Sequence, residues 1–455
     1  MLGLGLSDYA PGVIYGVFII VAFLTLFYKN TIGVLFISFF LPIYSLLNKV
    51  IKSELPLAKD IIDILVITML LGWFLQSKKE EGYVLSRSPL LLPIFLFVSY
   101  SFWSFIQGTL YLGAAFDSDM TMERLAVWKN YMIMPLLYII TYYTLKERKW
   151  KYALFILLFF SFLIMDYKFR QTFRWVQHTH YFEKSRLGGT IGFLGPNEWG
   201  GLHTIYTLFL IGLFMIDKHV WRRLAYAILI GGGTYCLMYS FSRGAYVGFL
   251  VGLFFIAFVR SKKLLIPLIL FLIIWKSVVP LSVVERIEGT IVDQSDLAQS
   301  ERTDLMSVGG TELDTAKRAE IWSMAWNYFS ENPISGIGFR TFMNMTEWDT
   351  HNVYLKMLTE QGLIGLALYL WLYVLAWRSG WRLYRHGNEE LLKAFGFAFL
   401  CAVVGSIVVN FFGDRWMYLQ IGGLYWIFWA IADQEYSMIK ATKGQMTASL
   451  EDRSA

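Results

Sequence analysis

Long apolar segments separated by short polar ones fill most of the chain. Each is about 16 to 25 residues long, enough for a helix to cross a hydrocarbon layer about 30 Å thick. Because backbone groups in lipid must be hydrogen-bonded within the protein, each segment predicts a transmembrane helix, about twelve or thirteen in all. The predicted helices cover residues 10–28, 31–47, 61–76, 90–109, 127–145, 152–166, 194–216, 224–241, 244–260, 264–283, 355–377, 394–412 and 417–432.

The longest polar stretch, residues 284–352, divides these segments into two unequal groups. Residues 1–283 hold the N-terminal group and residues 353–432 the C-terminal group, and residues 433–455 form a polar tail. Inside the long stretch, residues 315–330 have the spacing of an amphipathic helix, which we expect to lie against the bundle or the membrane interface. Its apolar side is expected to carry Ala319, Trp322, Ala325, Trp326 and Phe329.

The composition supports an all-α polytopic membrane protein. Hydrophobic residues make up 56% of the chain and charged residues 16%, whereas a soluble domain has roughly half and about a quarter. The two cysteines, Cys236 and Cys401, both lie in apolar segments, which excludes a disulfide framework. The net charge of +6 arises in loops, and no basic stripe with interleaved aromatic residues predicts nucleic-acid binding.

Lysine and arginine concentrate in loops that alternate along the chain. Cytoplasmic loops are enriched in these residues, so the segments 77–89, 146–151, 217–223, 260–263 and 377–393 are expected in the cytoplasm. The long stretch 284–352 then faces outside, which in a bacterium means the periplasm. The loop 48–60 also falls outside and breaks the pattern, since it holds three lysines and two acidic residues.

Three basic side chains on the predicted outer face are candidates for chemistry. Arg243 occupies the tip of a tight hairpin, where it either binds a ligand or anchors the hairpin at the interface. Arg318 lies near the start of the amphipathic helix, where it either binds a ligand or only forms an ion pair on the surface. His351 stands at the outer entrance of an apolar segment, where it could simply hydrogen-bond at the interface. Together they suit a diphosphate-linked substrate, because arginine holds phosphate oxygens and histidine accepts a hydroxyl proton.

Weaker patterns indicate other chemistries. Asp117 and Asp119 have the spacing that metal-dependent glycosyltransferases use, and that mechanism predicts loss of activity with a chelator. His178 and His180 lack nearby partners that would complete a metal site, so no metal is predicted. The glycines at 231–233 lie in an apolar segment, where small residues let helices approach. A transporter of lipid-linked glycans would need charges near mid-span, and Lys276 is the clearest of few.

The segments 317–342 and 350–366 resemble the conserved core of the O-antigen ligase and polymerase superfamily. The segment 240–246, SFSRGAY, also resembles the family's Ser-Arg-Gly-Ala motif. The matching positions are Arg318, Ile321, Trp322, Pro333, Gly336, Gly338, His351, Asn352, Tyr354, Leu355, Glu360, Gly362 and Gly365.

The resemblance implies an inverting, metal-independent glycosyltransferase of the bacterial inner membrane that uses no cofactor. Its members take a glycan from undecaprenyl diphosphate on the periplasmic face. Ligases pass it to a lipid A–core sugar, polymerases to another repeat unit, and related enzymes to protein side chains. A ligase is the reading we prefer here, with the other two as alternatives and a flippase as the alternative from another class.

The resemblance also assigns roles to residues. His351 is implied as the base that activates the acceptor hydroxyl, and Arg243 and Arg318 as the ligands of the donor diphosphate. Further candidates are Arg340, Arg186, Asn197 and Asn352.

Overall fold

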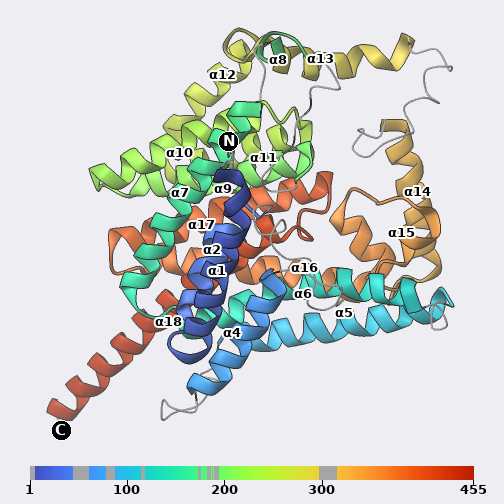
Figure 1. Cartoon of the computed structure of the whole chain (residues 1–455). Coiled ribbons are helices and arrows are strands. Elements are labelled where there is room, and N and C mark those ends of the chain that lie inside the picture. The colour runs from blue at the N-terminus through green and yellow to red at the C-terminus, as the bar shows by residue number, and fades with distance from the viewer. Residues whose placement is uncertain are drawn as a thin grey trace, which may run out of the picture.

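The computed structural model describes residues 6–44, 61–77, 88–113, 118–172, 176–181, 186, 188, 194–296 and 315–454. These residues form helices and no strands, which confirms the all-α class (Figure 1). The N-terminal helices are α1 (Leu6–Phe27), α2 (Thr31–Phe40), α4 (Ile61–Ser77), α5 (Leu91–Tyr111), α6 (Ser118–Thr144), α7 (Arg148–Thr172) and α8 (Val176–Thr179). They are followed by α9 (Pro196–Ile216), α10 (Val220–Met238), α11 (Arg243–Arg260), η3 (Lys262–Leu264), α12 (Leu265–Val278) and α13 (Leu281–Asp296). After the gap come α14 (Thr315–Glu331), α15 (Thr341–Thr346), α16 (Val353–His386), α17 (Glu390–Val409), η5 (Asn410–Phe412) and α18 (Leu419–Ser454).

Helices account for every apolar segment that the sequence predicted, as far as the described residues extend. Six of them are long and apolar enough to cross a membrane, and a seventh is added if α12 and the start of α13 count as one bent span. These features confirm a polytopic membrane protein. The expected number of twelve or thirteen crossings stays a prediction.

The helices α9 and α17 form the centre of the bundle and contact each other along their length (Figure 1). Their apolar windows are 78% and 72% buried inside the protein, well above the other long helices. Small residues bring them together, since a Cβ at Gly212 would lie 2.6 Å from the Cα of Ala398. α10, α11 and α16 pack around this pair; Arg243 begins α11, and His351 and Asn352 immediately precede α16.

The helix α16 is kinked, and the chain before it docks into the kink. Gly362 has φ 63° and ψ −165°, a conformation that only glycine adopts readily. The kink frees the carbonyl oxygens of Thr359 and Glu360, which accept from the amides of Ile337 (3.0 Å) and Gly338 (2.8 Å). The glycines of the Pro-x-x-Gly-x-Gly and Glu-x-Gly motifs therefore serve one structural purpose, the docking of these two segments.

Two expectations about the long polar stretch were wrong in detail. The predicted span 264–283 ends early, because α12 stops at Val278 and α13 leaves after Pro280 at a bend of 102°. The amphipathic helix is confirmed as α14, but Ala319 and Trp326 are exposed. Its buried side carries Ala325, as expected, together with Ile321, because α14 packs on the chain just before α16 as well as on the bundle.

Candidate functional site

A polar cavity of about 230 Å³ lies at the end of the bundle that carries α14 and α15. Five stretches of chain surround it: α6, the first turn of α9, the segment around α15, the start of α16 and the loop before α18. It is lined by Val127, Tyr131, Glu198, Phe339, Arg340, Met343, Asp349, His351, Lys356, Asp414, Arg415, Met417 and Tyr418. Of the predicted site residues, His351 and Arg340 are in this lining.

His351 stands in a strained backbone conformation directly before α16. Its φ of 48° places it in the left-handed region, which costs a non-glycine residue about 1–3 kcal/mol. Two contacts hold the turn: the His351 amide donates to Asp349 Oδ1 at 2.7 Å, and Trp322 Nε1 donates to the Thr350 carbonyl at 2.8 Å. Strain of this kind concentrates at functional sites, because the surrounding structure must over-determine it.

The environment of His351 keeps its ring neutral. Burial lowers the pKa of His351 below its ordinary value, and the guanidinium groups of Arg318 and Arg415 lower it further. The carboxylates of Asp349 and Glu198 act in the opposite direction but do not reverse the shift. A neutral imidazole at neutral pH can accept a proton, as a general base must.

Asn352, a further candidate from the sequence, caps α16. Its side-chain Oδ1 accepts from the amides of Tyr354 (3.0 Å) and Leu355 (3.2 Å), two donors that the helix itself leaves unsatisfied. Tyr354 in turn donates from its hydroxyl to the carbonyl of Ile407 at 2.7 Å. These contacts fix where α16 begins and so position His351, the residue that precedes the cap Asn352.

Four arginines gather next to His351. Burial lowers the pKa of Arg318, and the positive charges of Arg243, Arg415 and Arg186 lower it further, so the four groups are close enough to repel. Arg318 lies one turn of α14 before Trp322, which ties that helix to the His351 loop. The structure therefore brings Arg243 and Arg318, expected together from the sequence, to one place.

The first turn of α9 carries the carboxylate and amide that face these arginines. Arg186 Nη2 donates to Asn197 Oδ1 at 3.0 Å, and Arg415 Nη1 donates to Glu198 Oε1 at 2.7 Å. Asn197 and Arg186 stand beside the cavity residue Glu198 rather than in the cavity lining itself. The following glycine, Gly201, makes room, since a Cβ there would lie 2.9 Å from Arg415 Nε.

Lys356 sits on the other side of the cavity and is fully compensated. Its Nζ lies 3.0 Å from both Asp349 Oδ2 and Asp414 Oδ2, and Tyr131 donates its hydroxyl to the same Asp414 oxygen. The two acids come from the loop before α16 and the loop before α18, so Lys356 joins these two loops.

Glu360 supports Arg340. Its Oε2 accepts the Arg340 amide at 2.8 Å and holds that residue at φ 56°, again in the left-handed region. The Arg340 side chain donates from Nη2 to Glu123 Oε1 at 2.9 Å. Arg340 thus lines the cavity but carries a carboxylate partner.

Sequence reasoning missed the residues that the loop before α18 supplies. Asp414 and Arg415 are 5% and 4% exposed, in the loop between η5 and α18. An available signal was the FFGDRW segment itself, because an Asp-Arg pair between two apolar segments is costly unless it has partners. Glu198 and Lys356 gave weaker signals. For Glu198, an acidic residue in the first turn of a helix stabilises that helix whether or not it belongs to a site.

The rival metal patterns are not brought together. His178 Nε2 contacts the Tyr235 hydroxyl at 2.8 Å, whereas His180 Nδ1 lies 3.3 Å from Glu285 Oε1. Asp119 is exposed in the first turn of α6, and Asp117 lies outside the described residues. Neither pattern contributes a residue to the cavity lining.

The fold and the cavity together define a polytopic membrane protein with a cationic site at one end of its helix bundle. Residues 224–370 match the family model described as O-Antigen ligase. This match, over about a third of the chain, supports the O-antigen ligase and polymerase superfamily that the motifs indicated, and it suggests glycosyltransferase activity in the broad sense. No curated protein matches the chain. The matched segment includes Arg243, Arg318 and His351, while Arg415 lies beyond it.

Proposed function

We propose that this protein is an O-antigen-ligase-type inverting glycosyltransferase that moves a glycan from undecaprenyl diphosphate to an acceptor hydroxyl. The observation that carries the proposal is the crowding of Arg243, Arg415 and Arg186 around Arg318, beside a neutral His351. Arg415 is buried and the other three arginines are half-buried, and gathering such groups is unfavourable unless anions balance their charge. A diphosphate offers charge and oxygen geometry that match them.

In the proposed reaction, the diphosphate of the donor is bound by Arg243 and Arg318, with Arg415 close by. His351 takes the proton from the acceptor hydroxyl as its oxygen attacks the anomeric carbon. The bond from that carbon to the diphosphate oxygen breaks, the configuration inverts, and undecaprenyl diphosphate leaves with the electron pair. The arginines stabilise the charge that develops on the leaving oxygen, so this reaction requires no metal and no cofactor.

The position of the site suits a lipid-linked donor. The cavity lies where α16 enters the bundle, so an isoprenoid tail could remain in the bilayer while its diphosphate reaches the arginines. The alternation of basic loops supports a periplasmic orientation in the bacterial inner membrane. The acceptor we propose is a lipid A–core sugar, and a growing glycan or a protein hydroxyl would use the same geometry.

The two rival functions gain no support. For a flippase, the clearest mid-span charge was Lys276, but it is 60% exposed at the end of α12 and pairs with Glu288. For a metal-dependent transferase, Asp119→Asn should remove most of the activity, whereas the proposed mechanism predicts turnover within about twofold of wild type.

Reconstitution tests the proposal directly. The purified protein in liposomes is given a polyprenyl-diphosphate-linked glycan together with a lipid A–core acceptor, and the products are resolved by size. One addition to the core with an inverted anomeric linkage supports a ligase. A ladder of repeat units would replace it with a polymerase, and binding of the donor without any new glycosidic bond would overturn the proposal.

A further inference from the structure

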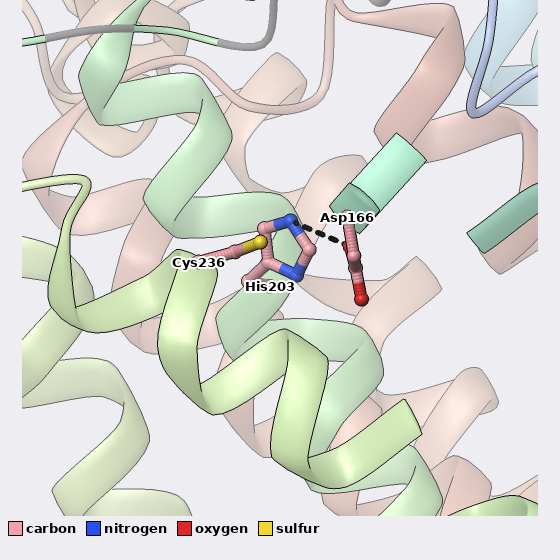
Figure 2. A group of neighbouring side chains, drawn as sticks. All are labelled: Asp166, His203 and Cys236. Carbon is pink, nitrogen blue, oxygen red and sulfur yellow. Dashed lines mark ion pairs between the residues drawn. The ribbon is translucent and has the colours of Figure 1, made fainter. Parts of the chain in front are cut away.

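A second group of chemically active side chains lies inside the bundle, away from the arginine site. Asp166 comes from α7, His203 from α9 and Cys236 from α10, and all three are buried (Figure 2). One ligand atom from each lies within 4.8 Å of the other two. Figure 2 shows the His203 ring with Cys236 on one side and Asp166 on the other, and one ring nitrogen is directed at the Asp166 carboxylate.

Two of the glycines noted in α10, Gly232 and Gly233, make this meeting possible. A Cβ at Gly232 would lie 2.6 Å from Asp166 Oδ2, and one at Gly233 would collide with the Thr207 hydroxyl. Without side chains at these positions, α10 approaches α7 and α9 closely enough for Cys236 to reach the carboxylate. The small residues noted in the sequence therefore serve a polar contact as well as helix packing.

Two of the three groups have an unused polar atom aimed into the cluster. Asp166 Oδ1 and His203 Nε2 are buried and have no hydrogen-bond partner within the described part of the chain. They lie 3.7 Å apart, too far for a hydrogen bond. The Cys236 thiol is hydrogen-bonded to the Asp166 carboxylate. Buried polar atoms are almost always satisfied, so an orphaned pair at one point indicates a missing ligand.

We propose that Asp166, His203 and Cys236 bind one thiophilic divalent cation, with Zn²⁺ as its reference. Carboxylate oxygen, imidazole nitrogen and thiolate sulfur are the ligands that zinc takes, with bond lengths of about 2.0–2.3 Å. Two such ligands on a tetrahedral ion stand about 3.5 Å apart, close to the distance between Asp166 and His203.

Charge balance favours a divalent ion in this buried place. One thiolate and one carboxylate cancel the two positive charges, and His203 binds as a neutral ring, so the filled site has no net charge. Binding releases the thiol proton, and any proton on the carboxyl, to solvent. The three protein ligands leave a fourth position for water.

The ion would be structural and would fix α7, α9 and α10 to one another beneath the arginine site. His203 stands about one and a half helical turns after Glu198, which pairs with Arg415. Cys236 comes shortly before the turn that carries Arg243. The ion does not touch the proposed diphosphate ligands, and it has no part in the proposed reaction.

Metal content and cobalt spectroscopy test this inference without any activity assay. The intact protein in detergent is stripped with a chelator, dialysed, and titrated with Zn²⁺ for stoichiometry or Co²⁺ for absorption. Wild type should bind one ion per chain, show a thiolate-to-cobalt charge-transfer band, and unfold at a higher temperature with Zn²⁺. Cys236→Ser should lose the band, while Cys401→Ser, which changes the other fully buried cysteine, should keep it.

The ligands other than sulfur provide independent variants. Asp166→Asn and His203→Asn should each weaken Zn²⁺ binding at least about tenfold, and they carry the test if Cys236→Ser does not purify as a monodisperse species. A wild-type protein that binds no stoichiometric metal, or a cobalt band that persists in Cys236→Ser, would overturn the proposal. In that case the three residues form a hydrogen-bonded polar cluster only.

Discussion

Two cations near the cavity differ in how their charge is compensated. Lys356 lines the cavity and lies 3.0 Å from each of two carboxylates, the buried Asp414 and the half-buried Asp349. Arg318 makes no hydrogen bond or ion pair with another described residue through its buried Nε, and its strongest charged neighbours are three arginines. Lys356 is buried and Arg318 is half-buried, so the more deeply placed cation is the one that has carboxylate partners.

The contrast separates framework from ligand-binding charge. Lys356 joins the start of α16 to the loop before α18, so its charge is used within the protein. Arg318 adds positive charge where positive charge is already high, which is useful only if an anion arrives. We therefore expect substitutions on the Lys356 side to change stability and substitutions on the Arg318 side to change donor binding.

The largest effect is expected for the proposed base. His351→Ala removes the proton acceptor and should lower glycan transfer by about 10²–10⁴-fold, since that is the usual contribution of a general base. Transfer is measured in proteoliposomes by the label in the product. His180→Ala is the matched control, because His180 is exposed and pairs only with Glu285; equal losses in the two variants would mean a general effect on folding.

The next largest effect is expected for Lys356 and concerns the stability of the protein. Lys356→Met should reduce the free energy of unfolding by about 3–5 kcal/mol, because it leaves the buried carboxylate of Asp414 and the half-buried one of Asp349 without their cation. Thermal unfolding in detergent, followed by tryptophan fluorescence, measures the change. The double variant Lys356→Met/Asp414→Asn should recover part of it, and a single variant as stable as wild type would show that Lys356 is not the framework charge described above.

For Arg318, the expected effect is smaller and appears in the affinity for the donor diphosphate. Arg318→Gln should weaken affinity for undecaprenyl diphosphate by about 1–3 kcal/mol, the range of a charge-assisted hydrogen bond, with unchanged or slightly raised stability. Lys317→Gln is its control, because it removes an equal charge from a side chain that lies over the Trp348 ring at 3.7 Å. Equal weakening by both variants would mean that the loss of affinity reflects the change in net charge and not a specific contact of Arg318.

The smallest expected effect is a shift in pH dependence. The neutral form of His351 is required, and its pKa is lowered by burial and by Arg318 and Arg415. Activity should therefore be level at neutral pH and fall only as pH drops through a value below 6.5. In Arg318→Gln, the loss of one positive neighbour should raise the pKa of His351, so the residual activity should begin to fall at a higher pH than in wild type. A wild-type activity that already falls as pH drops through values above 7 would contradict the assignment of neutral His351 as the base.

Most of the fold could be predicted from hydropathy, because helix length in a membrane is set by the thickness of the hydrocarbon layer. The motif residues Arg318 and His351 could also be found, since a charged or titratable group at an outer helix end is unusual. Their proximity could not, because it depends on Trp322 reaching the Thr350 carbonyl and on the kink at Gly362. No local spacing encodes that contact between α14 and the chain before α16.

The residues that sequence reasoning missed share one physical reason. Arg415 and Asp414 follow α17, and Glu198 begins α9, so their contacts join segments that are far apart along the chain. Asp166, His203 and Cys236 likewise come from three helices, each at a position that reads as an isolated polar residue in an apolar segment. Partners across helices determine which of these groups are compensated, and only the packed bundle shows them.

The most direct measurement separates donor binding from transfer in one preparation. Binding of undecaprenyl diphosphate and single-turnover glycan transfer are measured in the same nanodiscs for wild type, His351→Ala and Arg318→Gln. We predict that His351→Ala binds the lipid within about twofold of wild type but transfers glycan about 10²–10⁴-fold more slowly, and that Arg318→Gln binds it about 10–100-fold more weakly. Turnover by His351→Ala at the wild-type rate, or unchanged binding by Arg318→Gln, would contradict this account.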